Sequence, residues 1–154
     1  MIAAWRIVKT RHAADAFSGE GARLYGGRWN HRGTSVVYAA DSLALAALEQ
    51  FMHLAGKHVA IRFVCFRIDV PDAVNVDVLP RGSLPRNWRR EPAPDETKDL
   101  GTAWVRRGAA AVLRVPSVVV PVEHDFVLNP GHPDFTRLRL SKPQPFTFDP
   151  RMWK

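Results

Sequence analysis

The sequence has little cysteine, few lysines and no long apolar run. One cysteine, Cys65, in 154 residues excludes an internal disulfide, and its apolar neighbours indicate a small core residue rather than a nucleophile. No apolar stretch approaches the roughly 20 residues that cross a bilayer. A charge at Arg6 falls where a secretory signal needs its apolar core. These absences predict a soluble protein of the cytoplasm that does not contact a membrane.

Several familiar catalytic motifs are absent as well. There is no G-x-x-x-x-G-K-[ST] phosphate loop and no G-x-G-x-x-G dinucleotide fingerprint. The six histidines lack the close pairing of H-E-x-x-H, so no metal site is predicted. No G-x-S-x-G elbow marks a nucleophilic serine. Any catalytic chemistry has to come from a less familiar set of residues.

Arginine dominates the charged residues that are present. The chain has 22 basic and 15 acidic residues and a formal charge of +7, and five of the basic residues are lysines. Such an excess suits a phosphate-bearing ligand, an acidic partner or nucleic acid. The arginines are dispersed, which is more typical of a solvated surface than of a nucleic-acid stripe. Their densest group, residues 86–90, lies in a proline-rich segment at 80–94 that is predicted to be an exposed loop.

The apolar pattern predicts one α+β domain over residues 1–154. Strands outnumber helices, which favours a mostly antiparallel or mixed sheet. A glycine-rich loop is expected at 18–33. Helices are expected from 42 to about 54, with a stop near Gly56, and from 95 to 107. The expected strands are 5–8, 35–40, 59–68, 74–79, 110–115, 118–122, 126–128, 137–140 and 146–148.

The first expected helix is apolar over most of its circumference. At 100° per residue only a narrow arc remains for Ala46, Glu49, Gln50 and His53. This predicts a largely buried helix whose Glu49 carboxylate points out of the remaining gap. The alternative that helical periodicity leaves open is a solvated polar stripe.

Three side chains form a candidate site. Arg28, in the glycine-rich loop, can present a planar fork of donors to a diphosphate or carboxylate. Tyr38 can stack on a flat heterocycle while its hydroxyl stays hydrogen-bonded. Glu49 can accept from a ribose hydroxyl and stabilise positive charge at an anomeric carbon. The structural alternatives are a loop arginine held by a backbone carbonyl, a core tyrosine and a solvated glutamate.

Two blocks of the sequence resemble the RES domain, a family named after an arginine, a glutamate and a serine. The first block contains residues 26–30 (GGRWN), 37–39 (VYA) and 43–49 (LALAALE). The second contains residues 115–117 (VPS) and 129–135 (NPGHPDF). With Gly19 and Gly33 they span residues 19 to 135, and residues 67–108 carry no family motif.

The resemblance implies a bacterial toxin with a fold like that of ADP-ribosyltransferases, NAD as the substrate and a helix-turn-helix antitoxin of the Xre-like class. It implies that Arg28, Glu49 and Ser117 are the three naming residues and that Tyr38 and Asn129 are two further polar positions of the site. NAD then offers a diphosphate to Arg28, a nicotinamide ring to Tyr38 and a ribose to Glu49, with Ser117 near the amide or ribose. Asn129 is included among the NAD-binding candidates with Arg28, Tyr38 and Ser117, but it precedes a proline, which favours extended geometry, so it is expected to organise its loop more than to touch the ligand.

Two further residues have expected roles at the edge of this site. Trp29 is expected to be a packing anchor rather than a ligand contact. Arg6, on the first strand, is a candidate phosphate contact that stays outside the predicted site.

The acceptor of ADP-ribose stays open between water or phosphate and a protein side chain, such as one on an enzyme of nucleotide metabolism. Ala47, two positions before Glu49, replaces the acidic residue or glutamine common in protein-modifying transferases, which argues weakly against that pattern. The competing class is a nucleic-acid-binding or RNA-cleaving toxin, for which residues 86–90 interleave basic and aromatic side chains. Otherwise nucleic acid is expected only indirectly, through the antitoxin.

Overall fold

The computed structural model describes residues 1–54 and 61–153. Eight strands form one sheet in the order β4-β5-β6-β2-β1-β3-β7, with β8 also paired to β3. Of the strand pairs, β4–β5 is parallel and the others described are antiparallel. The predicted α+β class with a mixed sheet is therefore confirmed. The strands are β1 Ile2–Lys9, β2 Val37–Ala40, β3 Phe63–Val70, β4 Val76–Val78, β5 Val112–Pro116, β6 His124–Leu128, β7 Arg139–Leu140 and β8 Gln144–Phe146.

Three α-helices accompany the sheet in the described residues: α1 Glu20–Tyr25, α2 Leu43–Met52 and α3 Asp95–Arg107. The start of α2 is set by Ser42, whose Oγ accepts a hydrogen bond from the Leu45 amide at 3.0 Å. The end of α3 is set by Gly108, which takes the left-handed conformation (φ 63°) that favours glycine. Short 3-10 turns occur at Thr10–His12, Arg81–Ser83, Pro133–Arg137 and Pro150–Trp153. No helix of the described residues is long and apolar enough to cross a membrane.

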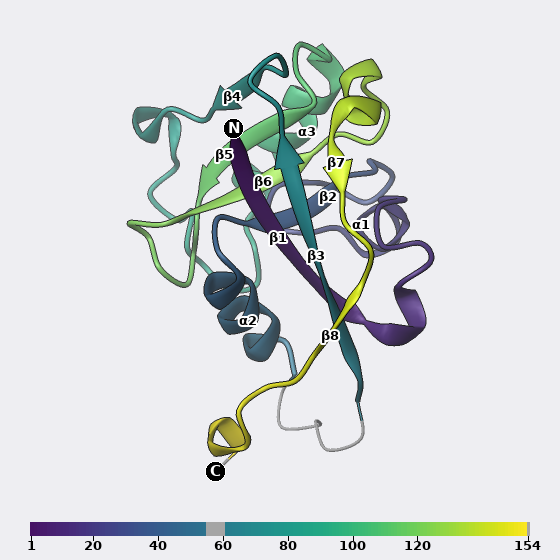
Figure 1. Cartoon of the computed structure of the whole chain (residues 1–154). Helices are drawn as coiled ribbons and strands as arrows, with labels where there is room; N and C mark the ends of the chain where they lie inside the picture. The colour runs from purple at the N-terminus through teal and green to yellow at the C-terminus, as the bar shows by residue number, and fades with distance from the viewer. Residues whose placement is uncertain (55–60, 154) are drawn as a thin grey trace.

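Helices α2 and α3 lie over the same face of the sheet. Period-two alternation and the pairing of β2 with β6 put Tyr38, Ala40, Asp125 and Val127 on that face. Helix α2 packs over Ala40 and its neighbours on β1 and β3, whereas Trp104 of α3 packs over Val127 and β5. Figure 1 shows α2 beside β1 and α3 near β5, at the other end of the sheet. The strip between the two helices contains the side chains of the candidate site.

Two predicted elements, and the predicted burial of a third, are wrong. The loop at 18–33 contains α1, a six-residue helix that periodicity does not reveal because it is short and glycines flank it at Gly19 and Gly26. Residues 118–122 are not a strand, because the Val119 and Val120 amides donate to Ser117 Oγ instead of to a neighbouring strand. Helix α2 is also less buried than predicted.

Only one side of α2 faces the sheet. Leu45 and Ala46 are buried, whereas Leu48 is 43% and Met52 67% exposed. Part of the wide apolar surface of this helix is therefore exposed to solvent.

Other boundaries move by a few residues. Strand β3 begins at Phe63, and of the expected strand 59–68 residues 59 and 60 lie outside the described part, as does Gly56. Strand β4 shortens to three residues, β5 starts at Val112, and β7 keeps two residues because a 3-10 turn runs through Arg137. Helix α3 matches its expected range.

Candidate functional site

The GGRWN segment forms a tight turn held from inside by Asn30. This asparagine is fully buried, and its Nδ2 donates to the carbonyls of Ala22 at 2.9 Å and Thr34 at 3.1 Å. A Cβ on Gly27 would lie 2.6 Å from Tyr38 Oη, so only glycine fits there without displacing the tyrosine. Trp29 is 3% exposed and packs beneath α3, in agreement with its expected role as a packing anchor.

Tyr38 is fixed to this turn through its hydroxyl. Tyr38 Oη donates to Asn30 Oδ1 at 2.6 Å and accepts from the Trp29 amide at 3.0 Å. Burial raises the pKa of Tyr38 well above its usual value, so the phenol stays neutral at physiological pH. The hydroxyl already has both partners and the half-buried ring packs against the apolar cluster of Trp29 and Trp104, so only the uncovered part of the ring can serve a flat ligand.

Arg28 points its guanidinium at the loop that precedes α3. Its Nη1 donates to the carbonyls of Trp88 at 3.0 Å and Arg90 at 2.8 Å, and its Nη2 pairs with the Glu91 carboxylate. The Arg28 side chain is 13% exposed, whereas that of Glu91 is 77% exposed. One nitrogen of the guanidinium is thus held by backbone carbonyls. The other pairs with the exposed carboxylate of Glu91, which an anionic ligand could replace.

Glu49 meets Ser117 although 68 residues separate them in the chain. Ser117, at the end of β5, is fully buried and its Oγ donates to Glu49 Oε1 at 2.7 Å. The same oxygen accepts from the Val119 and Val120 amides, each at 3.1 Å. Because the Ser117 oxygen accepts from two backbone amides, its hydroxyl proton points towards Glu49.

A second carboxyl, that of Asp125 on β6, contacts Glu49 and was not among the predicted site residues. Burial, the hydrogen bond with Glu49 and the charges of Glu49 and Asp41 raise the pKa of Asp125 to about 10. In the sequence this residue is only an acidic side chain directly before the apolar run Phe126–Leu128, and it is the pairing with Ala40 that puts it on the helix-covered face.

Electrostatic interactions connect the two halves of the site through Tyr38. Burial has the largest effect on the pKa of Tyr38; the hydrogen bond from the Trp29 amide and the charge of Arg28 lower that pKa, and Asp125 raises it where its carboxyl is ionised. The structure therefore gathers four of the predicted residues, Arg28, Tyr38, Glu49 and Ser117, around the strip between α2 and α3.

Asn129 forms a local turn instead of contacting the other site residues. Its backbone N–H donates to the Ala111 carbonyl at 2.8 Å, and its side-chain Oδ1 accepts from the backbone N–H of Gly131 at 3.0 Å. This is the loop-organising arrangement expected for it.

Arg6 lies on the other face of the sheet and is used structurally. It donates to the carbonyls of Ala16 and Tyr38, each at 2.8 Å. Burial lowers the pKa of Arg6 to about 10, which still leaves it charged at neutral pH. Because Trp5 pairs with Ala40 and shares its face, Arg6 points away from the face that bears Glu49 and Ser117 and is poorly placed to reach a ligand there.

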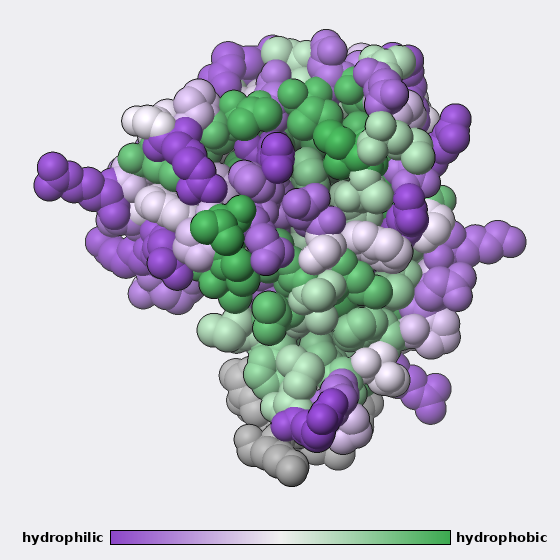
Figure 2. All heavy atoms as spheres, turned by 60° about the vertical axis from the view of Figure 1, so that its left-hand side comes forward, coloured by the Kyte–Doolittle hydropathy of each residue, from purple (hydrophilic) through white to green (hydrophobic). Residues whose placement is uncertain are grey.

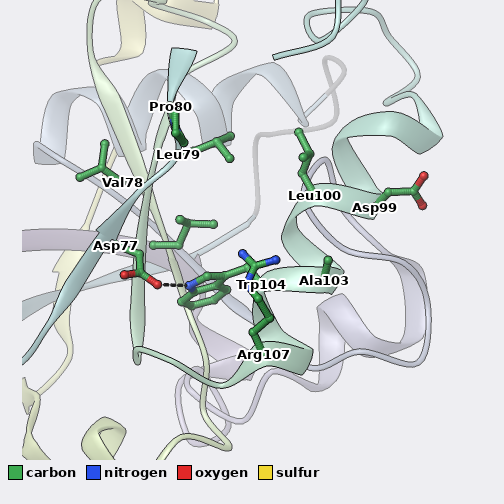
Figure 3. A pocket seen from close by; sticks show the side chains of 10 residues that line it. Asp77, Val78, Leu79, Pro80, Asp99, Leu100, Ala103, Trp104 and Arg107 are labelled. Atoms are coloured by element: carbon green, nitrogen blue, oxygen red, sulfur yellow. Dashed lines mark hydrogen bonds between the residues drawn. The ribbon is translucent and has the colours of Figure 1, made fainter. Parts of the chain in front are cut away.

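A hollow of about 430 Å³ lies elsewhere, between β4 and α3. Figure 3 shows Asp77 and Trp104 in its wall, where Trp104 Nε1 donates to Asp77 Oδ2 at 2.9 Å. None of the candidate site residues lines it, so its shape carries no information about that site. Among the described residues no group of three or more histidine, cysteine, aspartate or glutamate side chains can hold a metal ion.

The fold and site define a small α+β protein with an arginine fork, a neutral tyrosine and a serine-bound carboxylate on one sheet face. A family model, the RES domain, matches residues 3–149. The chain belongs to the RES-domain family, as the two sequence blocks predict.

Curated relatives match nearly the whole chain. "Toxin Res" of Yersinia enterocolitica is 42% identical over 149 residues, covering 96% of this chain and 97% of the relative. "Prs ADP-ribosylating toxin" of a Sphingobium species is 40% identical over 152 residues, covering 96% and 94%. "Toxin Res" of Photorhabdus laumondii is 34% identical over 151 residues, covering 97% and 96%.

A solved structure has the same fold. A chain in the crystal structure of the M. tuberculosis MbcT–MbcA toxin–antitoxin complex superposes with a TM-score of 0.75 and covers 95% of this chain and 84% of its own length. At 23% identity the likeness concerns the fold.

Proposed function

We propose that this protein is the toxin of a bacterial toxin–antitoxin system, acts in the cytoplasm and consumes NAD by breaking its nicotinamide–ribose bond. The observation that carries the proposal is the Glu49 carboxylate fixed by the buried Ser117 hydroxyl at 2.7 Å, on a site that also contains Arg28 and Tyr38. The names of the curated relatives support the toxin role, and one of them includes ADP-ribosylation.

The residues suit the charge changes of that reaction. When the bond between ribose C1′ and the ring nitrogen breaks, its electron pair leaves with nicotinamide, and the ribose acquires oxocarbenium character. A carboxylate held against the ribose stabilises this charge as it forms, as in glycoside hydrolysis. Arg28 would bind the diphosphate in place of Glu91, and the Tyr38 ring would face the nicotinamide.

For the acceptor we favour a protein side chain over water or phosphate. The support is the Sphingobium relative, 40% identical over 152 residues, whose name describes an ADP-ribosylating toxin. The nucleophile attacks C1′, forms the new bond there and gives up one proton, so nicotinamide and an ADP-ribosylated product result. With water or phosphate the same step releases ADP-ribose or its phosphorylated form.

We also propose that a helix-turn-helix antitoxin of the Xre-like class covers the mouth of this site. Beside Glu49, α2 exposes Leu48 and Met52, and the turn after Ser117 exposes Val122 at 82%. Figure 2 shows apolar side chains gathered over the face on which α2 lies. An apolar area next to a reactive carboxylate suits a partner that blocks access, and the charge of +7 suits an acidic surface on that partner.

The test measures nicotinamide release from NAD by the purified protein, with and without a bacterial lysate. Transfer predicts release that depends on lysate, with ADP-ribose retained on a protein band. Rapid release without lysate indicates hydrolysis or phosphorolysis.

Glu49→Gln keeps the shape of the side chain and removes its charge, so it should abolish either activity while leaving the fold intact. Glu123→Gln, an exposed site close by, is the matched control and should behave as the wild type. Near-normal turnover by Glu49→Gln contradicts the mechanism. Expressed in a bacterium without the antitoxin, Glu123→Gln should arrest growth like the wild type, whereas Glu49→Gln should allow normal growth.

The RNA alternative gains no support from the loop on which it depends. Trp88 packs against the apolar cluster of Trp104 and Leu113, and Arg89 Nε donates to the Val118 carbonyl at 3.1 Å. An aromatic side chain in that position offers little area for a base to stack on. RNA cleavage or salt-sensitive RNA binding, with NAD left intact, would favour the alternative.

A further inference from the structure

Asp125 occupies an unusual position for an aspartate. It pairs with Ala40 of β2 and Val115 of β5 in the middle of the sheet, on the face that α2 covers. Its Oδ1 is buried and receives no hydrogen bond from any described donor. Its carboxyl instead contacts the carboxyl of Glu49. Two adjacent carboxylates repel each other unless one of them holds a proton.

We propose that Asp125 is a positioning residue for Glu49: its carboxyl holds a proton and donates it in a hydrogen bond to the Glu49 carboxylate. Ser117 donates to Oε1 of the same group at 2.7 Å. Glu49 is thereby held by two side-chain donors, one from the end of β5 and one from the middle of β6. This inference rests on the proposed function only for its catalytic consequence, since the proton itself is a property of the folded chain.

The surroundings of Asp125 explain why the proton stays. From α2 it faces Glu49, from the turn before α2 it senses Asp41, and on β2 the nearest titratable group, Tyr38, is neutral. Burial is the largest of these influences, and the hydrogen bond and charge of Glu49 and the charge of Asp41 act in the same direction. Its neighbour His124 lies on the opposite face, where Nδ1 contacts Arg114 Nη2 at 3.0 Å. An ionised Asp125 would therefore place an unpaired charge on a half-buried side chain whose Oδ1 is fully buried.

The function of the proton is to orient one carboxylate without adding a second charge. A donor on each side restricts the rotation of Glu49, and a correctly oriented carboxylate stabilises the charge at C1′ more than a mobile one. When Asp125 loses its proton the hydrogen bond is lost and repulsion displaces Glu49. Turnover should consequently fall as the pH approaches the pKa of Asp125.

The experiment compares the wild type with Asp125→Ala and Asp125→Asn in the NAD assay. Asp125→Ala removes the donor and should lower kcat roughly 10- to 100-fold with little change in KM for NAD, because Glu49 acts on the transition state. Asp125→Asn supplies an amide donor that does not titrate and should rescue most of that loss. From about pH 8 to about pH 10.5 turnover should decline in the wild type but not in Asp125→Asn. An equal decline in both, or full turnover by Asp125→Ala, overturns the proposal.

A second readout does not depend on NAD. The carboxyl carbon of Asp125 can be followed by ¹³C NMR in the intact protein and assigned by its absence in Asp125→Asn. Its midpoint should lie several pH units above the ordinary value of about 3.9. An ordinary midpoint overturns the proposal even if NAD is cleaved. A high midpoint in a protein that leaves NAD intact refutes the proposed function and supports the proton on Asp125.

Discussion

Replacing Asp125 by asparagine should stabilise the protein, and increasingly so as the pH rises. In the unfolded chain this carboxyl has a pKa of about 3.9, whereas burial and the neighbouring Glu49 raise the pKa in the fold to about 10. Between these two values folding takes up a proton. Because the folded state binds more protons than the unfolded state, this residue makes the free energy of unfolding fall with increasing pH. Below the lower pKa the carboxyl is protonated in both states, so it does not change the free energy of unfolding.

The size of the effect follows from the unfolded pKa alone. At pH 7 the carboxyl must be protonated about three pH units above that pKa, and each unit costs about 1.4 kcal/mol. The folded wild type therefore loses about 4 kcal/mol that an asparagine would not lose. This is an upper value, since an amide needs slightly more space and makes a weaker hydrogen bond to Glu49 than a carboxylic acid. In a chain of this size, a gain of about 2 kcal/mol, half of that upper value, corresponds to a rise of about 5 °C in Tm.

The assay is urea unfolding of both proteins at several values between about pH 5 and about pH 8. The difference in unfolding free energy should grow by about 1.4 kcal/mol per pH unit, because one proton separates the two proteins. The control is Asp72→Asn. The N-terminal amine lowers the pKa of the exposed Asp72, so this group is ionised in both states across the range and its removal should add no slope. A difference for Asp125→Asn that does not change with pH refutes the reasoning, because it means that Asp125 folds in its ionised form.

Three further predictions concern packing and the arginine fork. Gly101→Ala should lower the unfolding free energy by about 3 kcal/mol in urea titration, because a Cβ there would lie 1.8 Å from the Trp29 carbonyl oxygen. Gly21→Ala, on a helix with nothing within 4 Å of the new Cβ, should be neutral or slightly stabilising, and an equal loss in both would contradict the close contact. Arg28→Lys should raise KM for NAD by about tenfold in steady-state assays, since a point charge replaces a planar fork, and an unchanged KM would remove Arg28 from the binding site. Glu91→Gln should lower KM by about two- to fivefold because it removes the carboxylate that competes for the fork, whereas a higher KM would mean that Glu91 supports binding.

The sequence predicts those parts of the fold in which local signals agree with the final structure. Helix α3 has acidic residues at its first turn, arginines at its last and Gly108 after it, and its limits match the expectation. Asp41 and Ser42 are both suitable capping residues before α2, and the structure shows that Ser42 caps the helix, with its Oγ accepting from the Leu45 amide. The grouping of Arg28, Tyr38 and Glu49 also needs only short connections, because the three residues lie within one turn–strand–helix unit.

The missed features depend on contacts between distant segments. Asp125 gains its significance from the pairing of β6 with β2 and from the helix above that pair, neither of which leaves a mark in the local sequence. The valines after Pro116 have the composition of a strand, but the Ser117 hydroxyl takes two of their amides and turns the chain. The apolar surface of α2 led to an expectation of burial because periodicity measures how wide an apolar face is and not what covers it.

The proton on Asp125 also bears on how the proposed reaction is accelerated. In NAD the nicotinamide ring is already positively charged before the bond breaks, so a carboxylate close to the ring stabilises the bound substrate as well as the transition state. Acceleration needs an interaction that strengthens as charge moves from the ring to ribose C1′. Two carboxylates would strengthen the general attraction for the ring. One carboxylate, oriented by Ser117 and by a neutral Asp125, can instead be directed at the ribose carbon, where the new charge forms.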